Sequence, residues 1–145
     1  MKKRINSIIL FLIISLLIGC SNNDTGLQTA SIDDIQYKLD EKSSGFIVIT
    51  NETEAPFLDE VQTALLEKQQ TANLFNVFYN DGESKNTDGL SKNPFNFEMP
   101  SVNTMYYIKD GEVFEEFNLD RYEGLRQQEE LSLFLDIENR GRQNE

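Results

Sequence analysis

The stretch "FIVIT" (residues 46–50), followed by "NETEAPF" (51–57), decides the fold of this chain. The first five residues form an apolar, β-branched run, which is typical of a strand buried on both faces in the middle of an α/β sheet. The polar residues after it predict a loop. Pro56 favours the first turn of a helix, where its missing N–H costs nothing. The segment therefore predicts a buried strand that runs through a short loop into a helix.

Neighbouring segments extend this pattern on both sides. Apolar residues keep helical spacing from Phe57 to about Gln70, and "NLFNVFYN" (73–80) then alternates as a second strand does. Upstream, "SIDDIQYKLDEKSSG" (31–45) predicts a helix with Ser31 as its N-cap and acidic residues in its first turn. Residues 80–103 are rich in Asn, Asp, Gly, Ser and Pro and predict a long loop.

The C-terminal third carries the most definite local signal. In "TMYYIKDGEVFEEFNL" (104–119) two β-rich runs flank an Asp-Gly pair, which favours a tight hairpin turn. The segment 120–137 predicts a final helix, and the following residues form its expected apolar face: Leu125, Leu131, Phe134, Leu135 and Ile137. The element order α-β-α-β-loop-β-β-α predicts an α/β fold, a mixed sheet flanked by helices on both faces, with a disordered tail over 138–145.

The N-terminus has the features of an export signal. Three basic residues at positions 2–4 precede an apolar run over 8–18, which is shorter than the roughly 20 residues of a membrane-spanning helix. The run ends in Leu17-Ile18-Gly19-Cys20, which contains the single cysteine of the chain. An uncleaved membrane anchor with an incidental cysteine is the alternative interpretation.

The motif Leu17-Ile18-Gly19-Cys20 resembles the lipobox of bacterial lipoproteins. That resemblance implies removal of residues 1–19 as a signal peptide and attachment of a diacylglyceryl group to Cys20, so that palmitate would be incorporated there. Residues 20–30 would then be the lipidated cysteine and a flexible tether. The implied location is the extracytoplasmic face of the cell membrane, and the short lysine-rich signal is associated with Gram-positive hosts.

The region 31–137 resembles the thioredoxin-like family in its element order and in two short motifs. The window Glu54-Ala55-Pro56-Phe57 falls where that family has its CxxC loop, and Pro56 matches the proline of Cys-Gly-Pro-Cys. Glu54 and Phe57 occupy the two cysteine positions. Asn103 and Thr104 occupy the positions of the cis-proline and the threonine after it. The resemblance thus implies a thioredoxin-like domain that is redox-inactive, with a trans bond before Asn103 because a non-proline cis bond is costly.

Composition excludes several function classes. The 145 residues include 13 basic and 25 acidic ones, for a net charge of −12, which opposes binding to nucleic acid. Histidine is absent and cysteine occurs once, so Ser-His and Cys-His nucleophiles and a CxxC pair cannot form. We therefore expect no enzyme activity and no cofactor.

Three further segments are candidate sites. Glu52 and Glu54 either bind a cation or act as an acid–base pair, or they form a solvated acidic loop. Residues 80–89 do not meet the EF-hand pattern and predict a surface loop. In the aromatic region 93–107, large apolar residues either cover the core or form a patch for a partner: Phe95, Phe97, Met99, Tyr106 and Tyr107. Alternation sends the two tyrosines to opposite faces of a sheet.

These observations predict a membrane-anchored extracytoplasmic lipoprotein whose redox-inactive thioredoxin-like domain is a binding or assembly factor in the cell envelope. Its expected partners are the membrane, through diacylglyceryl-Cys20, and an envelope protein, with no role for nucleic acid. Two alternatives stay open. One is a carboxylate-based enzyme or divalent-cation-binding lipoprotein, and the other is a specialised exclusion or immunity lipoprotein.

Overall fold

A mixed five-stranded sheet with three helices makes up the described part of the chain, which in this computed structural model is residues 25–52, 54–78 and 92–137. The predicted α/β class, a mixed sheet flanked by helices, is confirmed. The elements are β1 (Gly26–Thr29), α2 (Ile32–Asp40), β2 (Gly45–Thr50), α3 (Pro56–Lys68), β3 (Thr71–Asn76), β4 (Thr104–Lys109), β5 (Glu112–Asn118) and α4 (Gly124–Leu135). No helix in these ranges is both long and apolar enough to cross a bilayer.

Strand β2 is the middle strand of the sheet, whose order is β1-β3-β2-β4-β5. It pairs in parallel with β3, where Phe46 lies opposite Ala72, and antiparallel with β4, where Val48 lies opposite Met105. All five residues of "FIVIT" are buried, as the apolar run predicts. The chain then passes through a short loop into α3, with Pro56 as the first residue of that helix.

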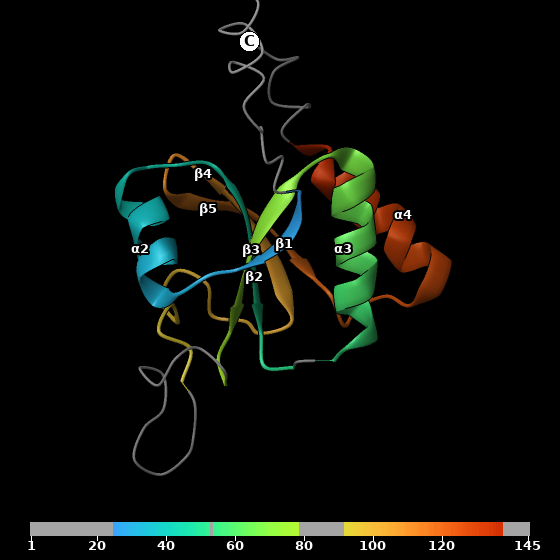
Figure 1. Cartoon of the computed structure of the whole chain (residues 1–145), viewed down its shortest axis with the longest axis horizontal. Coiled ribbons are helices and arrows are strands. Elements are labelled where there is room, and N and C mark those ends of the chain that lie inside the picture. The colour runs from blue at the N-terminus through green and yellow to red at the C-terminus, as the bar shows by residue number, and fades with distance from the viewer. Residues whose placement is uncertain (1–24, 53, 79–91, 138–145) are drawn as a thin grey trace, which may run out of the picture.

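The helices cover the sheet from both sides, α2 on one face and α3 with α4 on the other (Figure 1). Successive side chains of β2 point to opposite faces of the sheet. Phe46 and Val48 pack under α3 and α4, whereas Ile47 and Ile49 pack on the α2 side. Tyr107 and Tyr106 also belong to opposite layers, which confirms the predicted alternation, and both are buried.

The predicted hairpin forms between β4 and β5. Asp110 and Gly111 have φ values of 55° and 82°, the left-handed conformation that a tight hairpin turn requires. A Cβ at Gly111 would collide with the Leu39 carbonyl at the end of α2. The turn therefore needs glycine both for its conformation and for its close contact with α2.

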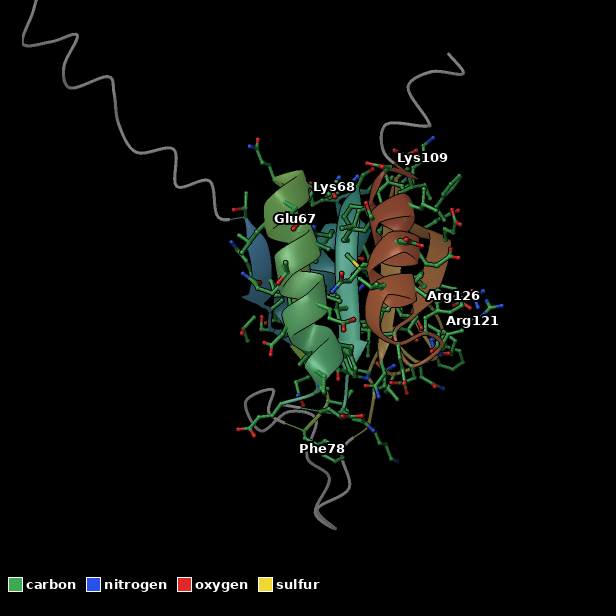
Figure 2. All side chains as sticks on the ribbon, turned by 90° about the vertical axis from the view of Figure 1, so that its right-hand side faces the viewer. Glu67, Lys68, Phe78, Lys109, Arg121 and Arg126 are labelled. Atoms are coloured by element: carbon green, nitrogen blue, oxygen red, sulfur yellow. The ribbon has the colours of Figure 1, made fainter. Side chains whose placement is uncertain are left out.

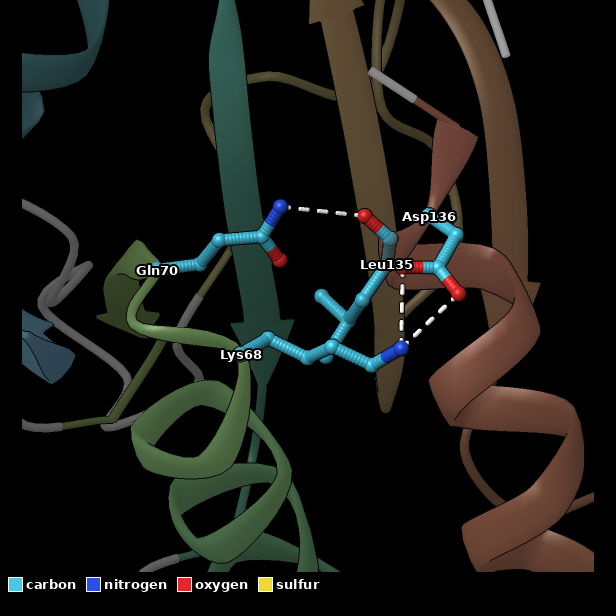
Figure 3. Close-up of polar contacts among 4 residues, drawn as sticks. All are labelled: Lys68, Gln70, Leu135 and Asp136. Carbon is cyan, nitrogen blue, oxygen red and sulfur yellow. Dashed lines mark hydrogen bonds and ion pairs between the residues drawn. The ribbon is translucent and has the colours of Figure 1, made fainter. Parts of the chain in front are cut away.

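The last turns of α3 and α4 are joined by polar contacts (Figure 3). Lys68 Nζ lies 2.9 Å from Asp136 Oδ1 and 2.8 Å from Oδ2, and Gln70 Nε2 donates to the Leu135 carbonyl at 3.0 Å. We call this group, Lys68, Gln70, Leu135 and Asp136, the clamped end of the sheet. Gly26, the first residue of β1, lies here as well, because its N–H donates to the Gln70 carbonyl at 2.8 Å.

Two sequence-based expectations are corrected. The predicted tether extended to Ala30, but Gly26–Thr29 is a strand that pairs in parallel with β3, so the domain begins near Gly26 and not near Ser31. Leu125, expected on the apolar face of the last helix, is 79% exposed. Helix α4 starts at Gly124, and Leu125 lies in its first turn, while the other four residues of that predicted face are buried.

Candidate functional site

The residues predicted to form a site lie around the end of the sheet where β2 stops and α3 begins. Within the window that matches CxxC, Glu54 and Pro56 are exposed, whereas Ala55 and Phe57 are buried against the core. Ala55 is the N-cap residue of α3 and makes no side-chain cap hydrogen bond. The window is therefore a short helix start with one carboxylate on its surface and one aromatic ring beneath it.

Asn103 connects the segments at this end of the sheet. It is only 6% exposed, and its Oδ1 accepts a hydrogen bond from Thr50 Oγ1 at 2.9 Å. Its Nδ2 donates to Glu52 Oε1 at 2.9 Å and to Asp120 Oδ2 at 3.1 Å. One amide thus joins the end of β2 to the connection between β5 and α4. We call this group, Thr50, Glu52, Asn103 and Asp120, the open end of the sheet.

The backbone of Asn103 has an uncommon conformation that asparagine adopts more readily than most residues. Its φ is 50°, in the left-handed region that Asn and Gly favour over other residues. Its carbonyl accepts the Leu119 N–H at 2.8 Å. All described peptide bonds are trans, the one before Asn103 included. The next residue, Thr104, is buried and turns its hydroxyl back to the Val102 carbonyl at 3.0 Å.

A groove opens beside Asn103, between the first turn of α3 and the segment that enters α4. Its volume is about 530 Å³. Apolar side chains form much of its lining, and three carboxylates, Glu60, Asp120 and Glu123, belong to it as well. The complete lining is Pro56, Phe57, Glu60, Leu119, Asp120, Tyr122, Glu123, Gly124 and Gln127. Such a mixture suits a ligand that presents an apolar group flanked by positive charge.

The wall of the groove on the α4 side is fixed by a buried amide. Gln127 is buried, and its Nε2 donates to the Leu119 carbonyl at 3.1 Å, which ties α4 to the end of β5. Across the groove, Glu60 Oε2 is inaccessible to solvent and has no hydrogen-bond partner among the described residues. Glu60 also lines a second hollow of about 380 Å³ between α3 and α4, which lie side by side in Figure 2.

The predicted pair Glu52 and Glu54 is divided between two environments. Glu52 is bonded to Asn103, and its carbonyl accepts from Asn76 Nδ2 at 2.8 Å, whereas Glu54 is exposed at the start of α3. The carboxylate that shares an amide with Glu52 is Asp120. Over the ranges that the structure describes, no group of three or more Asp, Glu or Cys side chains is arranged to hold a metal ion.

The aromatic region 93–107 mostly covers the core. Phe95 and Met99 are buried on the α2 side of the sheet, where the Phe95 ring lies 5.3 Å from that of Phe75. Tyr106 is bonded through its hydroxyl to the backbone of Ser101, and burial raises the pKa of its phenol. Only Phe97 points outward, at 95% exposure. One aromatic residue of this region is therefore free to contact a partner.

Other predicted positions lie outside the described residues. These are the signal peptide 1–19 with the lipobox Leu17-Ile18-Gly19-Cys20, the loop 80–89 and the tail 138–145. Conversely, sequence reasoning missed Glu60, Asp120 and Glu123, which the fold brings together from α3 and from the segment before α4. Only their common charge distinguishes them in the sequence.

Comparisons with known proteins do not assign this site. No protein-family model matches the sequence, and no curated protein matches it. The function is therefore inferred from the residues themselves.

Proposed function

We propose that this protein is an extracytoplasmic lipoprotein, anchored through Cys20, whose redox-inactive thioredoxin-like domain is a binding or assembly factor in the cell envelope. The observation that carries the proposal is the groove at the open end: it begins at Pro56 and Phe57, where the thioredoxin-like family would have its second active-site cysteine, and it is lined by apolar groups and carboxylates.

The domain assignment is supported by the neighbours of "FIVIT". This strand pairs with the 104–109 strand on one side and with the 71–76 strand on the other, and it leads into a helix that begins at Pro56. The window itself offers a carboxylate and a phenyl ring. Thiol–disulfide exchange requires a thiolate, which neither side chain supplies. Binding is thus the better use of this surface.

The charge of the groove indicates its partner. Glu60, Asp120 and Glu123 line it, and the one ion pair between described side chains, Lys68–Asp136, lies at the clamped end. A segment with Lys or Arg beside an apolar residue would complement the carboxylates and pack on the apolar part of the lining. The Tyr122 ring already has Arg121 and Arg126 over it, at 5.3 and 4.7 Å from its centroid. The expected partner is an envelope protein that presents such a segment.

Photo-crosslinking in living cells tests the binding role. A photoreactive amino acid at Glu123, on the groove, is expected to give a discrete adduct with one envelope protein. The matched control carries the same group at Tyr37, which is well exposed on α2. No adduct at Glu123, or the same adduct at both positions, would contradict a binding site at the open end.

Metabolic labelling tests the anchor separately. Radiolabelled palmitate is expected in the wild-type chain, and the label is expected to vanish in Cys20→Ala, because one cysteine is available for acylation. Circular dichroism of the variant checks that the domain remains folded. Label that persists in Cys20→Ala would refute the lipobox assignment and leave the groove unaffected.

A further inference from the structure

The two edges of the sheet differ in length and in protection. Strand β1 has 4 residues, and the side chain of Gln62 accepts the Leu27 N–H at 2.6 Å. Strand β5 has 7 residues, and no strand of the described chain pairs with its outer side. An unpaired strand edge presents backbone donors and acceptors to any extended chain that approaches it. The β5 edge is therefore the edge of this sheet that is available for pairing with another chain.

Strand β5 carries apolar side chains between its glutamates. Phe114 is 60% exposed and is the extra residue of a β-bulge, because Ile108 pairs with Val113 and Tyr107 with Glu115. Beyond the bulge, Glu115–Asn118 continues in regular pairing with β4. A pocket of about 230 Å³ lies between this stretch and α4, and Phe117, Leu133 and Phe134 contribute its apolar lining.

The charge on this edge is negative. Glu112, Glu115 and Glu116 are exposed on β5, which contains no basic residue, and Glu130 of α4 lines the pocket. One cation, Arg121, also lines the pocket, against the three carboxylates of Glu115, Glu116 and Glu130. The cations near this edge lie against rings: Lys109 Nζ is 5.5 Å from the Phe114 centroid, and Arg121 and Arg126 are 5.3 and 4.7 Å from that of Tyr122. Figure 2 shows Lys109 and Arg121 on the side of the molecule that carries α4.

These charges select between two possible occupants. Two copies of β5 would bring glutamates together across the strand pair, which destabilises pairing, and the chains carry a net charge of −12 each. A chain with Lys or Arg at alternate positions would place opposite charges across the same pair. An apolar residue between them could enter the pocket beside Phe117 and Phe134.

We propose that the β5 edge binds an extended, basic segment of a partner protein, which adds to the sheet as a strand along Glu115–Asn118 and inserts an apolar side chain into the pocket between β5 and α4. Backbone hydrogen bonds would supply affinity, and the pocket and the glutamates would supply specificity. The proposal requires neither the lipid anchor nor the groove at the open end.

Peptide binding to the full chain in non-ionic detergent tests this surface. The probe is a synthetic peptide of the length of β5 in which Lys and Leu alternate, and its matched counterpart has Glu in place of Lys. The Lys peptide is expected to bind and to slow hydrogen exchange at the amides of Glu115–Asn118. Glu116→Lys is expected to weaken binding by about tenfold, because Glu116 lies on the face of the sheet opposite to Phe117, where the Lys side chains lie when Leu enters the pocket, and the substitution replaces an attraction by a repulsion.

Glu67→Lys is the control for charge alone, since Glu67 is an exposed residue of α3. It is expected to change the affinity by no more than about twofold, which is the size of a screened long-range effect. Equal binding of the Glu peptide, equal weakening by Glu67→Lys, or unchanged exchange over Glu115–Asn118 would each overturn the proposal. Protection confined to the groove residues would also overturn it, and would favour the groove as the peptide site.

Discussion

The two ends of the sheet hold the same pair of helices in different ways. At the clamped end, the last turns of α3 and α4 are joined by the Lys68–Asp136 ion pair and by the bond from Gln70 to Leu135. At the open end, their first turns are separated by a groove of about 530 Å³, and a loop residue, Asn103, supplies the polar connections. The helices are thus fixed together at one end and spaced apart at the other, which leaves room for a ligand.

The largest effect is expected from Asn103→Ala. The substitution removes the bond from the buried Thr50 hydroxyl, which keeps its contacts with the Glu52 backbone. It also removes the bonds to the side chains of Glu52 and Asp120 and places alanine at a φ of 50°. Three lost hydrogen bonds of a buried amide and left-handed strain together predict a loss of about 2–4 kcal/mol in the free energy of unfolding. Chemical denaturation of both chains measures this difference.

Asn103→Gly separates the two contributions, because glycine adopts a positive φ without strain. We expect this variant to lose less stability than Asn103→Ala by about 1 kcal/mol. If both variants were as stable as the wild type, the open end would not depend on this amide.

A smaller effect is expected at the start of α2, which also lies toward the open end. Ser31 and Asp34 form a capping box: the Asp34 N–H donates to Ser31 Oγ at 3.2 Å, and the Ser31 N–H donates to Asp34 Oδ2 at 2.8 Å. Ser31→Ala is expected to cost about 1 kcal/mol in thermal or chemical unfolding. A cost as large as that of Asn103→Ala would mean that the helix cap stabilises this end of the sheet as much as the Asn103 amide does.

The same cap makes stability depend on pH. Hydrogen bonds from the Ser31 backbone and hydroxyl hold the pKa of Asp34 below its ordinary value. The contribution of this carboxylate is therefore complete above its unfolded pKa and is lost as the pH falls through the lower folded pKa. Denaturation at a series of acidic pH values is expected to show a shallower decline in Ser31→Ala than in the wild type. A steeper decline in the variant would contradict the assignment.

The smallest effect is expected at the clamped end. Lys68 and Asp136 retain 30% and 38% of their side-chain exposure, so solvent and salt screen their attraction. Lys68→Met is expected to cost about 0.5 kcal/mol, and a double-mutant cycle with Asp136→Asn isolates the pair. A coupling energy that did not fall at high salt, or one comparable to the effect of Asn103→Ala, would reverse the ranking of the two ends.

Local patterns predicted those parts of the fold that depend on neighbouring residues. "FIVIT" gave a buried strand because apolar side chains point to both faces, and Asp110-Gly111 gave the hairpin because few other pairs adopt two left-handed residues in succession. The Ser31 cap was likewise predicted from its own short segment.

Features that depend on contacts between distant parts of the chain could not be predicted from the sequence. "GLQT" is short and polar, and it becomes β1 because its backbone pairs with β3 and because Gln62 accepts its Leu27 N–H. The sequence places Asn103 at the cis-proline position but does not predict its hydrogen bonds, because its partners lie 53, 51 and 17 residues away in the chain. Glu60 and Glu123 lack any local pattern, and folding alone brings them to the same groove.

With the proposed lipid on Cys20, strand β1 would also limit the distance between the domain and the bilayer. About six residues separate Cys20 from Gly26, and a fully extended chain spans at most about 3.6 Å per residue, so the proposed lipid anchor allows a reach of about 20 Å. Because Gly26 starts beside Gln70, the clamped end would face the bilayer and the groove would point away from it. With such an anchor, a partner of the groove would approach from the side of the domain opposite to the bilayer.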